Sequence, residues 1–259
     1  MCSSDLAERA RRFAIEAEAA GRESLAAIAH LLAISARLRL GELEWDRERA
    51  HARELAHRSG DLAFAAGIEL LEVSRTIAAT PTDATDAALQ RMIAAADAEA
   101  MQMVLAGAAV HLYGVCREQG RLGEIEPLLV ASAALGQPLS NPIFVAHCRL
   151  EADDLDGAAA MLTTTGAGLE RLHRTWTHDA VLMLAADLSL ELGNPTWSEA
   201  IEERLLPAAG QVVTLLSLGV LGRADRGLGR LAEVRGDLDL AIERYGRARE
   251  LDEIGRAHV

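Results

Sequence analysis

Hydrophobic residues recur every three or four positions along almost the whole chain. In residues 25–40, for example, Leu25, Ile28, Leu32, Ser35 and Leu38 are three or four residues apart. A period of about 3.6 places such residues on the face of a helix that packs against a core. No segment shows the alternation of hydrophobic and polar residues that is typical of a half-buried strand. The pattern therefore predicts an all-α fold.

Short breakers separate the predicted helices and recur at similar intervals. Gly favours the end of a helix, and a following Asp or Asn can cap the next one. The turns at Gly120, Asp153, Gly193 and Gly236 are 33, 40 and 43 residues apart, which is close to one helical hairpin per repeat. We therefore expect one domain over residues 7–252, an α-α superhelix of stacked hairpins in which each unit packs against its neighbours.

The last predicted hairpin has the sharpest repeat signature. It resembles the tetratricopeptide (TPR) pattern of Leu-Gly, a small residue, Gly at the turn, then Ala, an aromatic residue and Ala. The matching residues are Leu228-Gly229, Ala232, Gly236-Asp237, Ala241, Tyr245 and Ala248. We expect the small residues to lie where the two helices cross, with the aromatic ring beside them.

A wider resemblance covers residues 115–252. It rests on Leu190-Glu191-Leu192-Gly193, on Leu205-Leu206-Pro207-Ala208-Ala209-Gly210, and on Arg226-Gly227-Leu228-Gly229-Arg230-Leu231-Ala232. This region is similar to the TPR-like helical-repeat sensor region of large, ATPase-containing bacterial transcriptional regulators of the LuxR type, which are common in actinobacteria. The resemblance implies signal reception through a protein or small-molecule effector. No functional residue of that family maps onto a motif here.

Both ends of the chain resemble translated sequencing adapter. Residues 253–259 can be encoded by DNA that contains the run AGATCGGAAGAGCACAC, and residues 1–6 can be encoded by its reverse complement. We therefore expect residues 1–6 and 253–259 to be non-native, and residues 7–252 to come from a longer gene. Such ends are excluded from fold reasoning.

Charge disfavours nucleic acid as a partner. The formal net charge is −13, and all 26 basic residues are Arg, so the Lys of a phosphate-binding loop is missing. Arg223, Arg226 and Arg230 fall along one helical face. We interpret them as a solvated face that pairs with acids such as Glu233 or Asp237, and we predict no direct nucleic-acid binding.

Membrane and disulfide signals are also weak. The most apolar segment, residues 99–116, is interrupted by Glu99, Gln102 and His111, so no run of about 18 apolar residues is present. The three Cys residues form no disulfide framework. We expect a cytoplasmic protein with no membrane partner.

Possible metal ligands lack the close pairing that metal sites usually show. His173 and His178 are five residues apart, which spreads them around a helix. We therefore interpret His173 and His178 as core or surface residues rather than metal ligands. The same interpretation applies to the other histidines and cysteines considered, which are His111, Cys116, His147 and Cys148.

Other candidate sites also have simpler structural interpretations. Gly227-Leu228-Gly229 follows no predicted strand, and the acids of Glu151-Ala152-Asp153-Asp154 are expected to be solvated or to cap a helix. Trp176 and Trp197 are expected to seal hairpins, and the remaining candidates to fill gaps in the core: Met92, Met101 and Met103. The sequence predicts no catalytic, cofactor or metal residue.

Three functions remain open. The first is a non-catalytic regulatory binding module of a signal-responsive transcriptional regulator. The second is the regulatory segment of a class III nucleotide cyclase, in which a similar region follows the ATPase. The third is a stand-alone TPR scaffold that binds peptides.

Overall fold

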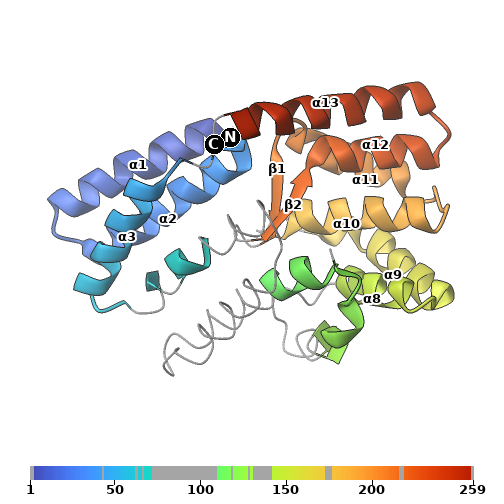
Figure 1. Ribbon diagram of the computed structural model, residues 1–259, viewed down its shortest axis with the longest axis horizontal. Coiled ribbons are helices and arrows are strands. Elements are labelled where there is room, and N and C mark those ends of the chain that lie inside the picture. Colours follow the sequence, from blue (N-terminus) through green and yellow to red (C-terminus); the bar gives the residue numbers. More distant parts are fainter. Residues whose placement is uncertain are drawn as a thin grey trace. The chain divides into compact units, whose positions relative to one another are not determined.

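The described part of the chain is almost entirely helical (Figure 1). The computed structural model describes residues 3–42, 44–61, 64–65, 67–71, 110–117, 119–127, 129–130, 142–172, 177–215 and 219–257. The prediction of a helical fold class is confirmed, apart from one small sheet. The superhelix of TPR-like hairpins and the single domain over residues 7–252 stay predictions.

The chain divides into two compact units. The first comprises Met1–Val115 with two short later segments, and the second comprises Cys116–Leu216 and Val220–Arg256. Each unit has its own buried residues, and each is described by itself below.

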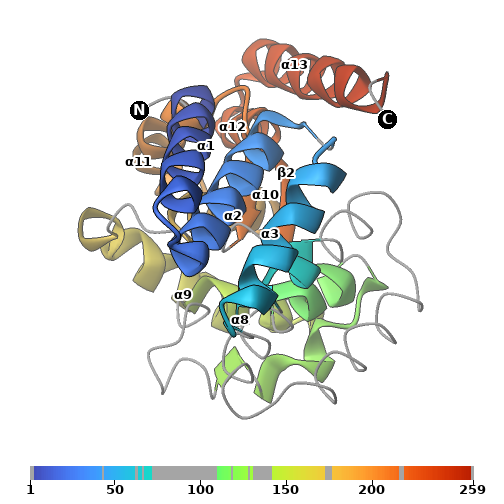
Figure 2. The same cartoon turned by 90° about the vertical axis from the view of Figure 1, so that its left-hand side faces the viewer.

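Consecutive helices of the first unit pack side by side. They are α1 (Ser3–Ala19), α2 (Glu23–Leu40) and α3 (Asp46–Arg58), with α2 in contact with both of the others (Figure 2). The turns begin at Gly21 and Gly41, which have φ values of +67° and +82°. This left-handed conformation is costly for residues with a Cβ atom and ends helices readily at Gly.

Alanine dominates the contact between these three helices. Because its side chain is a single methyl group, alanine allows helix axes to approach closely while remaining the best helix former. The buried cluster contains Ala17, Ala26, Ala27, Ala52, Leu55, Ala56, Ala65 and Ile68.

The second unit is arranged around α10 (His178–Glu191), which packs against four other helices. All residues from Ala180 to Ser189 are buried, so this part of the helix is enclosed on every side, and its one acidic residue, Asp187, is paired with arginine. Its helical neighbours are α8 (Pro142–Glu151), α9 (Leu155–Ala167), α11 (Ser198–Leu205) and α12 (Ala224–Val234). The other helical elements that the structure describes in this unit are α13 (Leu238–Ala257) and the 3₁₀ turns η1 (Leu122–Glu124), η2 (Leu169–Arg171) and η3 (Leu206–Ala208).

A two-stranded sheet interrupts the helices of the second unit, which contradicts the prediction that the chain contains no strand. The strands β1 (Val212–Leu215) and β2 (Gly219–Arg223) pair with each other (Figure 1). All four residues of β1 are buried. A strand that is buried on both faces has no polar alternation, so a short apolar run does not distinguish it from a buried helix.

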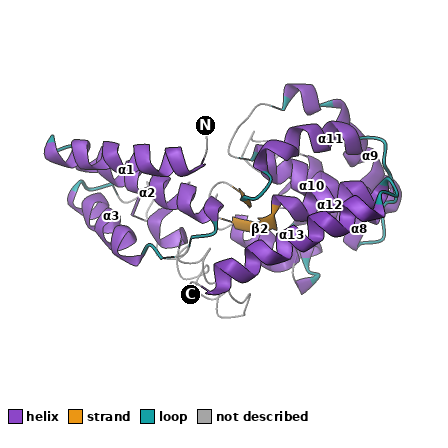
Figure 3. Cartoon of the chain, turned by 90° about the horizontal axis from the view of Figure 1, so that it is seen from above, coloured by secondary structure: helices purple, strands orange, loops and turns teal. Residues whose placement is uncertain are grey.

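The last hairpin packs as its sequence signature predicts. Helices α12 and α13 lie side by side after the turn at Gly236 (Figures 1 and 3). A Cβ atom at Gly229 would lie 2.7 Å from Cε1 of Tyr245, so the ring occupies the space that the glycine leaves. The Tyr245 hydroxyl donates a hydrogen bond of 2.5 Å to Glu233, which fixes the ring over α12.

We therefore expect Gly229→Ala to destabilise the protein by about 1–3 kcal/mol, as overpacking in a tight contact usually does. Gly246→Ala is the matched control, because a Cβ atom at Gly246 meets nothing within 4 Å. That change should be neutral or stabilise helix α13 by roughly 0.5–1 kcal/mol. Urea unfolding followed by circular dichroism measures both effects, and equal stabilities of the two variants would contradict the packing described here.

Candidate functional site

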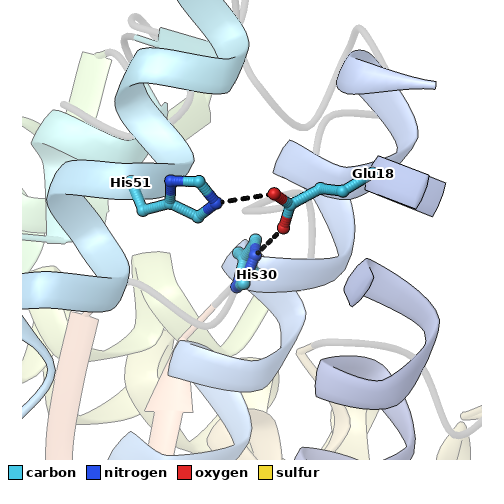
Figure 4. Close-up of side chains that lie close together, drawn as sticks. All are labelled: Glu18, His30 and His51. Atoms are coloured by element: carbon cyan, nitrogen blue, oxygen red, sulfur yellow. Dashed lines mark hydrogen bonds and ion pairs between the residues drawn. The ribbon is translucent and has the colours of Figure 1, made fainter. Parts of the chain in front are cut away.

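Ionisable side chains from three helices converge in the first unit. Glu18 is on α1, His30 is in the middle of α2, and His51 is on α3 (Figure 4). The Nε2 atom of His30 lies 3.0 Å from Glu18 Oε1, and the Nε2 atom of His51 lies 2.8 Å from Glu18 Oε2. The two imidazole rings meet edge to face, with centroids 5.3 Å apart.

A second carboxylate completes the arrangement around His30. The Nδ1 atom of His30 lies 3.1 Å from Oε1 of Glu48, which is also on α3. Both ring nitrogens of His30 therefore face carboxylate oxygens from different helices. Only the doubly protonated imidazolium can donate from both nitrogens, so this geometry favours the charged ring.

The local sequence explains how these groups reach one another. His30 projects from the alanine-rich face of α2, where small neighbours leave room for a ring between the helices. Glu48 and His51 are three residues apart on α3, which puts them on the same side of that helix. The short turns after α1 and α2 bring both flanking helices to this face.

The surroundings of His30 raise its pKa. Burial disfavours the charged ring and acts to lower the pKa, but the hydrogen bonds to Glu48 and Glu18 and their negative charges outweigh it. The carboxyl groups of Glu18 and Glu48 respond in the opposite sense. Burial acts to raise their pKa values, but the histidine contacts lower them overall, assisted at Glu48 by the charges of Arg11 and Arg37.

Arginine extends this network toward the surface. Arg37 Nη1 lies 3.3 Å from Glu48 Oε2, and the same guanidinium donates to Glu42 at 2.8 Å and to the Glu44 carbonyl at 2.7 Å. Arg11 Nε lies 3.9 Å from Glu48. These contacts hold Glu48 in place beside His30.

A cavity of about 310 Å³ adjoins the network. Charged side chains of both signs line it together with small apolar ones, and the lining residues come from α1, α2, the following turn and α3. They are Ala7, Glu8, Arg11, Ala33, Arg37, Leu40, Glu42 and Glu48.

The candidates singled out by the sequence lie elsewhere, and two of the histidines are core residues. His111 Nε2 lies 3.1 Å from the Leu70 carbonyl, and His147 Nε2 lies 3.0 Å from the Leu184 carbonyl, so both act as donors from buried positions. Burial lowers the pKa of His111 to about 4, and burial together with the charge of Arg117 lowers that of His147 to about 4.

The two cysteines that the sequence analysis considered, Cys116 and Cys148, are core residues. Cys116 and Cys148 are both buried, and the Cys148 thiol lies 3.5 Å from the Phe144 carbonyl. Burial and the charges of Glu126 and Glu151 raise the pKa of the Cys148 thiol to about 12, which keeps it protonated.

The acids near residue 153 are structural. Asp154 accepts a hydrogen bond of 3.0 Å from the Gly157 amide and caps α9, so the capping prediction is confirmed. Glu151 accepts from the Leu122 amide at 2.5 Å and ties η1 to α8.

Of the glycine and aromatic candidates, those in the described part of the chain have packing roles. A Cβ atom at Gly166 would overlap the indole of Trp197, which agrees with a sealing role for that ring. Gly227 lies within α12, which directly follows β2, so the expectation that no strand precedes this glycine pair was wrong. Its role is nevertheless in packing, because a Cβ atom at Gly227 would come 2.8 Å from Met183 Sδ. His178 Nδ1 lies 3.0 Å from Asp179 Oδ1. The other candidates lie outside the described residues: Met92, Met101, Met103, His173 and Trp176.

The interpretation of Arg223, Arg226 and Arg230 as a solvated face of one helix was wrong. Arg223 is the last residue of β2 and is buried, and only Arg226 and Arg230 lie on α12, although Arg223 does pair with an acid of the following helix. Arg230 pairs with Asp187 of α10, and Arg223 lies 3.0 Å from Asp252 of α13 and donates to the Leu251 carbonyl at 2.9 Å. Arg226 donates to the Leu221 carbonyl at 3.0 Å. The spacing of these arginines does not reveal that the helix begins only after Arg223, nor which neighbouring elements pair with them.

No family model, curated protein or solved structure matches the chain. Within the residues that the structure describes, no helix has the length and apolar content needed to cross a membrane.

The buried His147 should make the second unit sensitive to acid. Because its folded pKa is below the ordinary value of 6.5, the unfolded chain binds more protons between pH 6.5 and about 4, and stability falls as the pH falls through that range. Between pH 7 and 5 this loss amounts to about 2 kcal/mol.

His147→Gln tests this effect, because glutamine keeps an N–H donor for the Leu184 carbonyl but does not titrate. Urea unfolding at pH 7 and 5 should show a smaller acid loss in this variant than in the unaltered protein. His57→Gln, at an exposed position of α3, is the control and should leave the loss unchanged. An identical pH dependence in all three proteins would contradict the assignment.

Proposed function

We propose that this chain is a non-catalytic regulatory module of a bacterial signal-responsive transcriptional regulator. In this proposal the hairpins belong to a cytoplasmic α-α superhelix of TPR-like units, and a small effector binds in the first unit. The observation that carries the proposal is the cavity beside the His30 network. Its volume of about 310 Å³ is at the lower end of ligand pockets, which are usually about 300–1,000 Å³.

The lining of the cavity suggests how an effector would act. Arg11 comes from α1, Arg37 from α2 and Glu48 from α3, so one bound molecule would contact all three helices. A ligand shifts a conformational equilibrium only through contacts that differ between the two states. A site formed by three helices provides such contacts, because its shape depends on how these helices pack.

The lining combines the guanidinium groups of Arg11 and Arg37 with the carboxylates of Glu8, Glu42 and Glu48, so it favours a small zwitterionic effector whose carboxylate meets the arginines. Screening a library of small zwitterionic carboxylates by NMR against the ¹⁵N-labelled protein should shift amide signals around Ala33 and Leu40. Ala7→Phe, which fills the cavity from α1, should abolish these shifts. Ala50→Phe, at an exposed position of α3, should preserve them. Hits that bind both variants equally well would contradict an effector site here.

The resemblance of residues 115–252 to LuxR-type regulators supports the regulatory context. The complete gene tests that context directly. A phosphate-loop ATPase encoded upstream and a helix-turn-helix encoded downstream would agree with the proposal. A nucleotide cyclase domain, or no further domain, would contradict it in favour of a cyclase segment or a stand-alone peptide scaffold.

We also propose that the module does not bind DNA directly. The net charge of −13 repels phosphate, and Arg223 and Arg230 are engaged in intramolecular ion pairs. Titrating the chain into a fluorescent duplex at about 150 mM salt, where exposed charges are well screened, should give no saturable binding below about 1 µM. Tighter binding would place this chain in the DNA-reading surface.

A further inference from the structure

The ligand atoms of Glu18, His30 and His51 all lie within 4.8 Å of one another. Both histidines direct Nε2 toward the same carboxylate, at 3.0 Å and 2.8 Å (Figure 4). Two ligands of one zinc ion, each bound at about 2.1 Å, lie roughly 3.4 Å apart in a tetrahedron. Small side-chain rotations, with release to solvent of the protons that the Nε2 atoms direct toward Glu18, would therefore be sufficient to place an ion between these atoms.

The second coordination shell is already present. His30 Nδ1 faces Glu48 Oε1 at 3.1 Å, and Arg37 lies 3.3 Å from the other oxygen of Glu48. In metal sites a ligating histidine almost always donates its second N–H to a carboxylate, carbonyl or water, which fixes the ring and raises its basicity. Glu48 occupies this position on the buried side of His30, where its own side chain is 6% exposed.

We propose that Glu18, His30 and His51 form a binding site for a divalent first-row transition metal ion, with Glu48 as the outer carboxylate that orients His30. Two imidazoles and one carboxylate are the protein ligands of several zinc sites, so Zn²⁺ is the best-matched ion. This inference goes beyond the proposed function, because the site does not require an effector in the neighbouring cavity.

Solvent reaches the site from one side. The side chain of His51 is 41% exposed and that of Glu18 is 29% exposed, whereas His30 is 8% exposed. An ion held by these three side chains would keep a coordination position for water or for a donor group of another molecule, as open zinc sites do.

Isothermal titration of Zn²⁺ into the metal-stripped, untagged full chain tests the site. We expect one ion per chain with a Kd of about 10 µM or tighter, equivalent to a binding free energy of about −7 kcal/mol. His51→Ala and Glu18→Gln should each weaken binding at least about 30-fold. Glu48→Gln should weaken it about 10–100-fold, because it removes the charge of an outer-shell partner without removing a ligand.

His57→Ala provides the matched control, because His57 is an exposed histidine on the same helix as His51. Its Kd should stay within about twofold of the unaltered protein, and circular dichroism should show that all variants are folded. His51 is partly exposed, so its replacement tests the site without emptying the core. Absence of saturable Zn²⁺ binding below about 100 µM, or a Kd unaffected by both His51→Ala and Glu18→Gln, would overturn the proposal.

Discussion

Each of the two units buries charged groups between its own helices, and each of these groups needs a partner of opposite charge nearby. In the first unit His30 is placed between Glu18 and Glu48 and so connects α1, α2 and α3. In the second unit Asp187 of α10, which is 1% exposed, pairs with Arg230 of α12 and with Arg117. Removing one member of a buried pair typically costs about 3–5 kcal/mol, because the other charge is then left uncompensated.

The same requirement connects structure to function in the first unit. The alanine faces bring the helices close together, but they provide no directional contact of their own. The directional contacts between these helices are the hydrogen bonds and ion pairs around His30. Three residues of this network, Arg11, Arg37 and Glu48, also line the cavity. A ligand that competes for these charges would therefore act on the interactions that set the packing of the three helices.

The features that depend on local sequence pattern could be predicted from the sequence. The helical class follows from the period of hydrophobic residues, the capping role of Asp154 from its place after a turn, and the contact of Gly229 with Tyr245 from a repeat signature. The strand β1 was missed because a fully buried strand and a buried helix share the same apolar composition.

The candidate site could not be predicted in the same way. Glu18 is 12 residues from His30 and 33 from His51, and no local motif connects them. A histidine on an alanine-rich face also resembles an ordinary core histidine, which is what His111 and His147 are. Only the packing of three helices shows that His30 has a carboxylate at each nitrogen.

The pKa of His30, measured by NMR titration of its ring signals, tests most directly whether this network carries charge. The account predicts a pKa above the ordinary value of 6.5 in the unaltered chain, and a lower pKa in Glu48→Gln, where one of the two carboxylates is neutral. A pKa at or below 6.5 in the unaltered chain would contradict it, because burial would then outweigh the carboxylates and the three helices would not be joined by a charged imidazolium.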